Sequence, residues 1–314
     1  MLYNMDIVLE KEDKELLDNI TDSEQLFESA FNVRKNGCPF VKKETETIKI
    51  VSQKEGKEGI EIYVKNNGEK QLVNIPVLIT KGGLDDLVYN DFYIESGAQV
   101  TIVAGCGIHN CDKSDSRHNG IHSFYLEEGA KVNYIEKHYG SGDGEGAKVL
   151  NPITRVFLKK NSSLEMETVQ IEGVDSTIRE TIAKLEDNTN LVIKEKIKTS
   201  KNQYAKTIFE VDLDGVNSSC HLISRAVAED NSKQEFISNL RGNNKCYAHS
   251  ECDAILKDNG IALANPIVLA NNVDANLIHE AVIGKIAGEQ LLKLMSLGLS
   301  EKEAEEVIIN GFLK

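Results

Sequence analysis

The chain has 314 residues with 36 basic and 50 acidic side chains, which gives a formal net charge of −14 at pH 7. This balance disfavours binding to nucleic acid or to an anionic membrane surface, because both partners require a basic face. The amino-terminal residues contain acids where a secretory signal would carry bases, and no apolar run approaches the roughly 18 residues that span a bilayer. We therefore expect a cytoplasmic protein whose six cysteines are reduced, with no nucleic-acid or membrane partner.

The first region of the chain, residues 1–58, is predicted to be helical with a charged linker at its end. Apolar side chains recur near a helical period over residues 1–37. Thr21 and Glu24 have the spacing of a capping box, and Gly37 is placed to end the helix. Such a segment is expected to serve as a packing element or docking arm.

Short β-rich runs alternate with Gly, Asn and Asp over residues 59–272. Apolar anchor residues recur there at intervals of 32, 32, 27 and 28 residues, at Ile94, Leu126, Leu158, Leu185 and Leu213. A turn follows each of the first three anchors, and a second apolar residue stands six positions after each of the first four. Repeats of this length, made of strands without helices, are typical of a β-solenoid. The sequence thus predicts a mainly β protein with a right-handed parallel β-helix core, and a propeller or a β-sandwich is the competing architecture.

The last region, residues 273–314, is predicted to be helical. Residues 286–297 carry apolar side chains with a helical period, and Ser300 with Glu303 forms a capping box for a second helix. Both helices are too short to be stable alone, so we expect them to pack on the solenoid or on a partner.

A thiol, an imidazole and a carboxylate stand near the end of the solenoid as candidate metal ligands. Cys252 and His279 are 27 residues apart, which is one coil length, and Glu280 follows directly. Residues one coil apart are candidates for neighbours on adjacent strands, about 4.8 Å from each other. Cys, His and Glu together suit iron or zinc. The alternative is an inert buried thiol at Cys252, with His279 and Glu280 at the start of the following helix; His249 is either a spare ligand or a surface residue.

A second pair of candidate residues, Cys106 and His138, stands one local coil length apart, the same interval that separates Ile94 from Leu126. Both stand twelve positions after an anchor, and strict alternation gives them the parity of residues that point into the solenoid. A bulge at Gly105 would reverse that parity. A thiol beside an imidazole can be held partly as thiolate, which suits a sulfur acceptor. Plain core packing is the alternative.

The segment from Cys106 to Cys111 offers a third possibility, a structural zinc site. It contains His109, and His118 and His122 follow it, but the spacing fits no common zinc finger. A hydrolytic Cys–His pair is less well supported, because no nucleophile elbow is present. The sequence also lacks a G-x-x-x-x-G-K-[ST] motif, so we expect no ATP binding by the chain itself.

The strings S-E-C-D-A-I-L around Cys252 and I-H-E-A around Glu280 resemble the carboxy-terminal signature of the SufB/SufD family, the scaffold proteins of iron–sulfur cluster assembly. The resemblance covers roughly residues 90–312. SufB-type members carry a Cys and a Glu in these two contexts that are implicated in building the nascent cluster, whereas SufD-type members lack the Cys. They also carry a core Gly-Cys implicated in receiving sulfur, which matches Gly105-Cys106. At 314 residues the chain is short for the family and resembles its compact, SufB-like members.

The resemblance implies an assembly scaffold and not an enzyme. A transient Fe-S cluster would form on Cys252, with His279 and Glu280 as co-ligands or iron-entry groups, after sulfur arrives at Cys106. The implied partners are a sulfur donor protein, a SufC-like ABC ATPase on the carboxy-terminal helices, and a second SufB/SufD chain in a homodimer or heterodimer. Two other functions are considered: a β-helix carbohydrate-active enzyme, and a purely structural partner of the ATPase.

Overall fold

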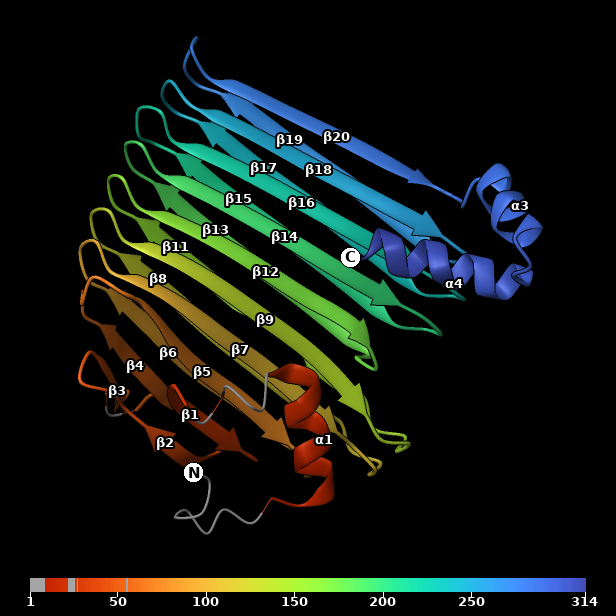
Figure 1. The fold of residues 1–314 in the computed structure, drawn as a ribbon, viewed down its shortest axis with the longest axis horizontal. Coiled ribbons are helices and arrows are strands. Elements are labelled where there is room, and N and C mark those ends of the chain that lie inside the picture. Colours follow the sequence, from red (N-terminus) through yellow and green to blue (C-terminus); the bar gives the residue numbers. More distant parts are fainter. Residues whose placement is uncertain (1–8, 22–25, 27, 55) are drawn as a thin grey trace.

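The protein is a β-solenoid of about eight turns with short helices at its two ends (Figure 1). A computed structural model describes residues 9–21, 26, 28–54 and 56–314. The prediction of a parallel solenoid flanked by helices is confirmed, and the propeller and sandwich alternatives are wrong. None of the helices in the described part of the chain is long and apolar enough to cross a membrane.

Two sheets form opposite walls of the solenoid, and from β4 onward the chain alternates between them, with β10 and β11 together occupying one position in sheet B. Sheet A contains, in spatial order, β2 (Cys38–Lys43), β1 (Ala30–Lys35), β5 (Lys70–Ile79), β7 (Gln99–His109), β9 (Lys131–Ser141), β12 (Ser163–Glu172), β14 (Asn190–Thr199), β16 (Ser219–Ala228), β18 (Tyr247–Leu256) and β20 (Asn276–Gly284). Sheet B contains β19 (Ile261–Ala270), β17 (Lys233–Gly242), β15 (Tyr204–Leu213), β13 (Ser176–Leu185), β10 (Lys148–Leu150) followed by β11 (Ile153–Leu158), β8 (Ser116–Leu126), β6 (Asp85–Ile94), β4 (Gly59–Val64) and β3 (Ile48–Ser52). The pairs β1–β2 and β3–β4 are antiparallel, and the other pairs are parallel.

The predicted anchors stack on one another along sheet B. In the parallel ladders each anchor lies opposite the next one, in the order Ile94, Leu126, Leu158, Leu185 and Leu213. The second apolar position behaves in the same way along sheet A, in the order Val100, Val132, Leu164 and Leu191. Both rows belong to one buried apolar cluster that runs through the solenoid, so each coil buries the apolar face of its neighbour.

A left-handed residue recurs at the same turn of successive coils. These residues are Gly97, Gly129, Asn161, Asn188 and Asn217, with φ values of 70°, 71°, 62°, 55° and 58°. Gly has no Cβ to oppose this conformation, and Asn tolerates it better than other residues. The turn chemistry read from the sequence therefore fixes the corner that sends the chain from sheet B to sheet A.

The amino-terminal prediction is partly wrong. Helix α1 (Lys11–Ile20) is present, but Thr21 is its C-cap and β1 and β2 follow it as an antiparallel hairpin. Asn36 and Gly37 form the turn with positive φ values of 49° and 78°, which is the turn chemistry that favours a hairpin. The segment forms a strand and not a helix because β1 pairs with β5, and this tertiary pairing outweighs the local helix propensity. The predicted partner of Thr21, Glu24, lies outside the described residues.

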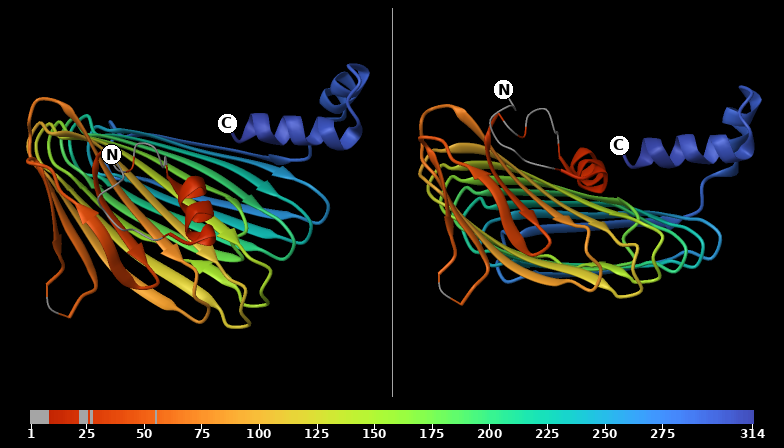
Figure 2. Two further views of the ribbon diagram at one scale, coloured as in Figure 1. Left: turned by 60° about the horizontal axis from the view of Figure 1, so that its bottom comes forward. Right: turned by 90° about the horizontal axis from the view of Figure 1, so that it is seen from below.

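At the carboxy-terminal end the strands continue through β20 to Gly284, and two helices follow, α3 (Gly288–Ser296) and α4 (Glu301–Phe312). The predicted capping box of Ser300 with Glu303 is present at α4. Helix α4 packs on the outer face of sheet A, where Ile309 contacts Val227. Helix α3 buries none of its residues and stands away from the solenoid (Figure 2).

Candidate functional site

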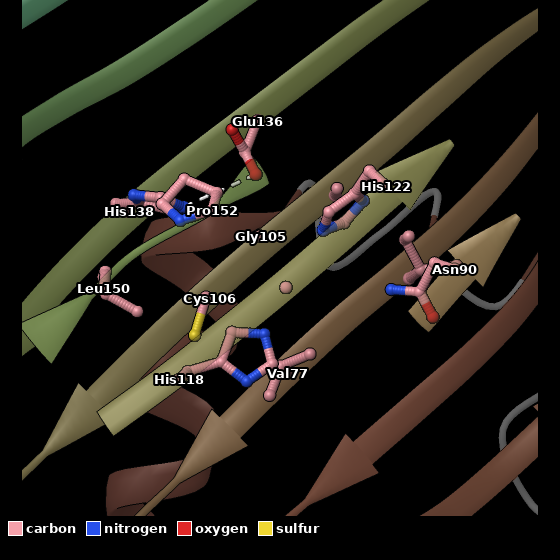
Figure 3. A pocket seen from close by; sticks show the side chains of 13 residues that line it. Val77, Asn90, Gly105, Cys106, His118, His122, Glu136, His138, Leu150 and Pro152 are labelled. Carbon is pink, nitrogen blue, oxygen red and sulfur yellow. Dashed lines mark ion pairs between the residues drawn. The ribbon is translucent and has the colours of Figure 1, made fainter. Parts of the chain in front are cut away.

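Cys106 and His138 are direct neighbours on β7 and β9, as their spacing predicted. The register between the two strands is unbroken at Gly105, so both side chains point into the solenoid. They line a small interior cavity together with His118, His122 and other side chains from β5 to β9 (Figure 3). The first candidate site is therefore a buried thiol in a cavity that is rich in imidazole.

Helix α1 covers the outer face of β7 behind this thiol. A Cβ at Gly105 would lie 2.7 Å from the Cβ of Ile20, and a Cβ at Gly107 would lie 2.9 Å from Leu16 Cδ2. The two glycines that flank Cys106 therefore allow the helix to approach the strand closely. The Gly-Cys motif has a packing reason that is independent of sulfur chemistry.

The surroundings of Cys106 disfavour its thiolate form in the folded state. Burial raises the pKa of the Cys106 thiol well above its usual range, and the Asp86 and Glu136 carboxylates raise it further. Burial also lowers the pKa of His138, although the Glu136 carboxylate offsets part of this effect. His138 Nδ1 lies 3.3 Å from Gln170 Oε1 and makes no hydrogen bond to Cys106. At neutral pH the pair is a neutral thiol beside a neutral imidazole.

A network of buried charges lies between the walls of the solenoid next to this cavity. Arg179 donates a hydrogen bond to Glu136, and its Nε lies 3.9 Å from Glu195 Oε1. Burial alone would raise the pKa of Glu136, but the Arg179 guanidinium holds it well below its usual range. Glu195 in turn accepts hydrogen bonds from Thr207 (2.7 Å) and Ser224 (2.8 Å).

Sequence reasoning missed this network, although a signal was present. Glu136 and Glu195 both stand ten positions after an anchor, Leu126 and Leu185 respectively, and so have inward parity. A charge at an inward position of a solenoid needs a buried partner, because an unpaired buried charge is too costly.

Cys252 lies beside the far end of this network. It is opposite Ser224 on β16 and points into a second small cavity that Glu195, Thr207 and Ser224 also line. Burial raises the pKa of Cys252 to about 12, and the Glu195 and Asp253 carboxylates contribute to the increase. The two candidate thiols thus face the same interior, and the network of Glu136, Arg179 and Glu195 lies between their two cavities.

The structure brings His279 to the face of Cys252 but does not bring Glu280 there. Cys252 is opposite Ala281 on β20, while His279 is opposite Ser250 two positions earlier, so the two side chains share the inward face. Glu280 is opposite Glu251 and points outward. All three predicted residues belong to strands, and the alternative that His279 and Glu280 begin a helix is wrong.

The segment from Cys106 to Cys111 does not assemble a metal site in the described chain. Cys106 points inward, whereas Cys111 lies at the surface, with its Sγ 3.2 Å from His109 Nε2. His118 is buried 3.0 Å from Asp86, and His122 lies in the interior cavity. A group of three His, Cys, Asp or Glu ligands occurs among the described residues at another place, on β16 and β18.

Acid is expected to destabilise the fold through His122. Burial is the main cause that lowers its pKa from 6.5 to about 4. Because the unfolded chain binds a proton at higher pH than the folded chain, stability from this group is complete above about pH 6.5 and is lost as the pH falls towards 4. The loss is about 3 kcal/mol. Urea unfolding at several pH values gives the free energy of unfolding of the wild type and of His122→Gln. The pH dependence that the variant lacks is the contribution of His122.

The His109→Gln variant serves as the control for this experiment. His109 lies near the surface and hydrogen-bonds to Ser141 (2.9 Å), so its replacement leaves the His122 environment intact. This variant should keep the pH dependence of the wild type. Equal pH dependence in the wild type and in His122→Gln would contradict the assigned burial.

The fold and these two interior sites define a β-solenoid that holds two separate free thiols, Cys106 and Cys252, within its walls. The family described as "SUF system FeS cluster assembly, SufBD core domain" matches residues 89–312. The chain therefore belongs to the SufBD family of iron–sulfur cluster assembly proteins.

Curated relatives carry the same family description. The chain is 27% identical over 266 residues to an iron-sulfur cluster assembly SufBD family protein of Methanocaldococcus jannaschii, with 83% of this chain and 82% of the relative covered. It is 28% identical over 228 residues to one of Methanothermobacter thermautotrophicus (72% and 54% covered), and 29% identical over 201 residues to one of Pyrococcus horikoshii (63% and 60% covered). The chain spans about half the length of the Methanothermobacter relative.

Proposed function

We propose that the chain is a scaffold on which an iron–sulfur cluster is built, with Cys106 as sulfur acceptor and Cys252 as the anchor of the nascent cluster. The observation that carries the proposal is that both thiols face one interior and that the network of Arg179, Glu136 and Glu195 lies between them. A thiolate is the usual protein ligand of iron in clusters. Membership in the SufBD family supports the same assignment.

In this proposal His279 is a co-ligand of Cys252, since both side chains lie on the inward face at the open end of the solenoid. Glu280, on the opposite face, takes the role of an iron-entry group. Mixed ligation suits a scaffold, because thiolate favours iron whereas imidazole and carboxylate allow the cluster to leave. Sulfur would come from a donor protein as sulfane sulfur, and Cys106 has to be exposed transiently to receive it.

The open end of the solenoid is the proposed surface for a second SufB/SufD chain. Strands β19 and β20 end their sheets there, and their exposed apolar side chains include Leu263, Ile267 and Val282. An edge strand with exposed apolar residues favours pairing with another chain. A homodimer or a heterodimer formed at this end would place Cys252 near the interface.

Anaerobic incubation of the purified chain with ferrous iron and sulfide tests whether the chain assembles a cluster. A scaffold should become brown, with iron and sulfide bound in comparable amounts and a thiolate-to-iron absorption band. A protein that stays colourless while folded would favour the purely structural partner of the ATPase.

Helix α3 is the proposed dock for a SufC-like ABC ATPase. Its Leu292 is 67% exposed and the following Leu297 is 76% exposed, although the helix contributes no buried residue to the fold. Replacing both leucines with glutamate should therefore abolish co-purification with the ATPase and leave the circular dichroism spectrum unchanged. The control is Val307→Glu on α4, which places the same acidic side chain at another exposed apolar position, 50% exposed. Retained co-purification of the double variant would place the dock elsewhere.

A further inference from the structure

Two imidazoles and a carboxylate converge on the outer face of sheet A near its carboxy-terminal end. His221 on β16 and His249 on β18 are direct ladder neighbours, and their rings stack with centroids 5.1 Å apart and planes 7° from parallel. Glu251 stands two positions after His249 on the same face. Ligand atoms of the three side chains all lie within 4.8 Å of one another.

The distances within this cluster suit a single small cation. Glu251 Oε1 lies 3.1 Å from His221 Nε2 and 3.5 Å from His249 Nδ1. Nitrogen and oxygen ligands bind zinc at about 2.0–2.2 Å, so two ligand atoms on one tetrahedral ion lie about 3.3 Å apart. The carboxylate oxygen already has this spacing to both ring nitrogens, and the ligand atoms of the two imidazoles lie within 4.8 Å of each other. The stacked rings have to turn towards the ion to bring their lone pairs together.

A fourth residue, Glu280, faces the far side of His249. Its Oε1 lies 3.6 Å from His249 Nε2, and that nitrogen is buried without a hydrogen-bond partner among the described residues. A buried polar atom without a partner is rare, and a second imidazole nitrogen that faces a carboxylate is the usual arrangement around a metal-bound histidine. A small shift of the exposed Glu280 would complete this hydrogen bond.

We infer that the outer face of strands β16, β18 and β20 holds a mononuclear site for a divalent first-row transition ion, with His221, His249 and Glu251 as ligands and Glu280 as the group that orients His249. Two imidazoles and one carboxylate form a ligand set that suits Zn²⁺ or Fe²⁺ and leaves positions for water. His221 and Glu251 are partly exposed, so an ion can enter from solvent.

This site is distinct from the proposed cluster anchor. Cys252 belongs to the same strand as His249 and Glu251 but has the opposite parity and points into the solenoid. The outer-face site shares Glu280 with the proposed iron-entry role but contains neither Cys252 nor His279. Zn²⁺ binding by Cys252→Ser and cluster assembly by His249→Gln therefore test the two proposals separately.

Competition with a chromophoric chelator measures Zn²⁺ binding by the purified full chain. We expect one tight equivalent in the wild type, and we expect His249→Gln and Glu251→Gln each to weaken it more than about tenfold. Glu280→Gln, which removes only the orienting carboxylate, should weaken it by about tenfold. Cys252→Ser should keep the wild-type affinity.

Asp253→Asn is the matched control, because Asp253 is an acid of the same strand and face that is not one of the converging groups. It should bind Zn²⁺ as the wild type does, and equal weakening by Asp253→Asn and Glu251→Gln would reduce the effect to surface charge and overturn the site. A thiolate charge-transfer band in the Co²⁺ adduct would also overturn it, since the ligand would then be a cysteine. Circular dichroism of each variant checks that the solenoid remains folded.

Discussion

Replacing Arg179 with methionine is expected to destabilise the solenoid by about 3–5 kcal/mol, because it leaves buried carboxylates without their cation. The Arg179 and Glu136 side chains are only 5% and 4% exposed, and Glu195 is equally buried. Two carboxylates that stay in the interior must either remain charged at high cost or bind protons. Urea unfolding followed by circular dichroism measures the change in the free energy of unfolding.

Two variants make this expectation specific. Arg155→Met removes the same side chain from β11, where Arg155 is exposed, and should change stability by less than about 0.5 kcal/mol. The double variant Arg179→Met, Glu136→Gln removes one of the two stranded charges and should recover part of the loss. Similar stabilities of Arg179→Met and Arg155→Met would show that the network contributes little to the fold.

The solenoid could be predicted because its repeat is written locally in the sequence. Each anchor and each left-handed turn residue depends on its own coil, and stacking then follows from the need to bury apolar faces. The hairpin at Asn36-Gly37 was missed for a different reason. Its Asn-Gly turn signal was present, but Gly37 was interpreted as the end of a helix because the preceding residues have a helical period. The pairing of β1 with β5 is a long-range effect that the local pattern does not contain.

The site was only partly predictable because face and register depend on the length of each coil. Cys106 and His138 were placed correctly, since the interval between them also separates their neighbouring anchors. The coil that follows Cys252 is longer than the interval from Cys252 to His279, so Ala281 is opposite Cys252 and His279 is two positions away. Glu280 stands one position before Ala281, so its side chain points to the opposite face of the strand. The length of the turn between β18 and β20 sets this register, and no local sequence pattern gives that length.

The cluster at His221, His249 and Glu251 illustrates the same dependence. The two histidines stand one full coil apart in the sequence, but a search for short metal motifs does not compare residues at such a distance. Only the register places their rings together. Long-range ligand pairs in a solenoid are therefore best sought at multiples of the coil length.

Cys252→Ser is expected to lose nearly all cluster assembly while the solenoid stays folded. Serine has almost the volume of cysteine, and Ser224 lies opposite position 252, where it can hydrogen-bond to the new hydroxyl. The free energy of unfolding should therefore fall by only about 1–3 kcal/mol. A hydroxyl is a poor ligand for iron, so the anchor of the nascent cluster disappears. The measurement is anaerobic reconstitution with iron and sulfide, read as bound iron and visible absorption.

Two other buried cysteines make the result specific to position 252. Cys220 is an inward thiol on the adjacent strand β16, and burial likewise raises its pKa. Cys220→Ser should load iron as the wild type does. Cys106→Ser should also assemble a cluster from free sulfide, but it should acquire sulfur poorly from a persulfide donor because its acceptor thiol is gone. Wild-type iron loading in Cys252→Ser would refute the assignment, and equal losses in all three variants would trace the defect to the core and not to a ligand.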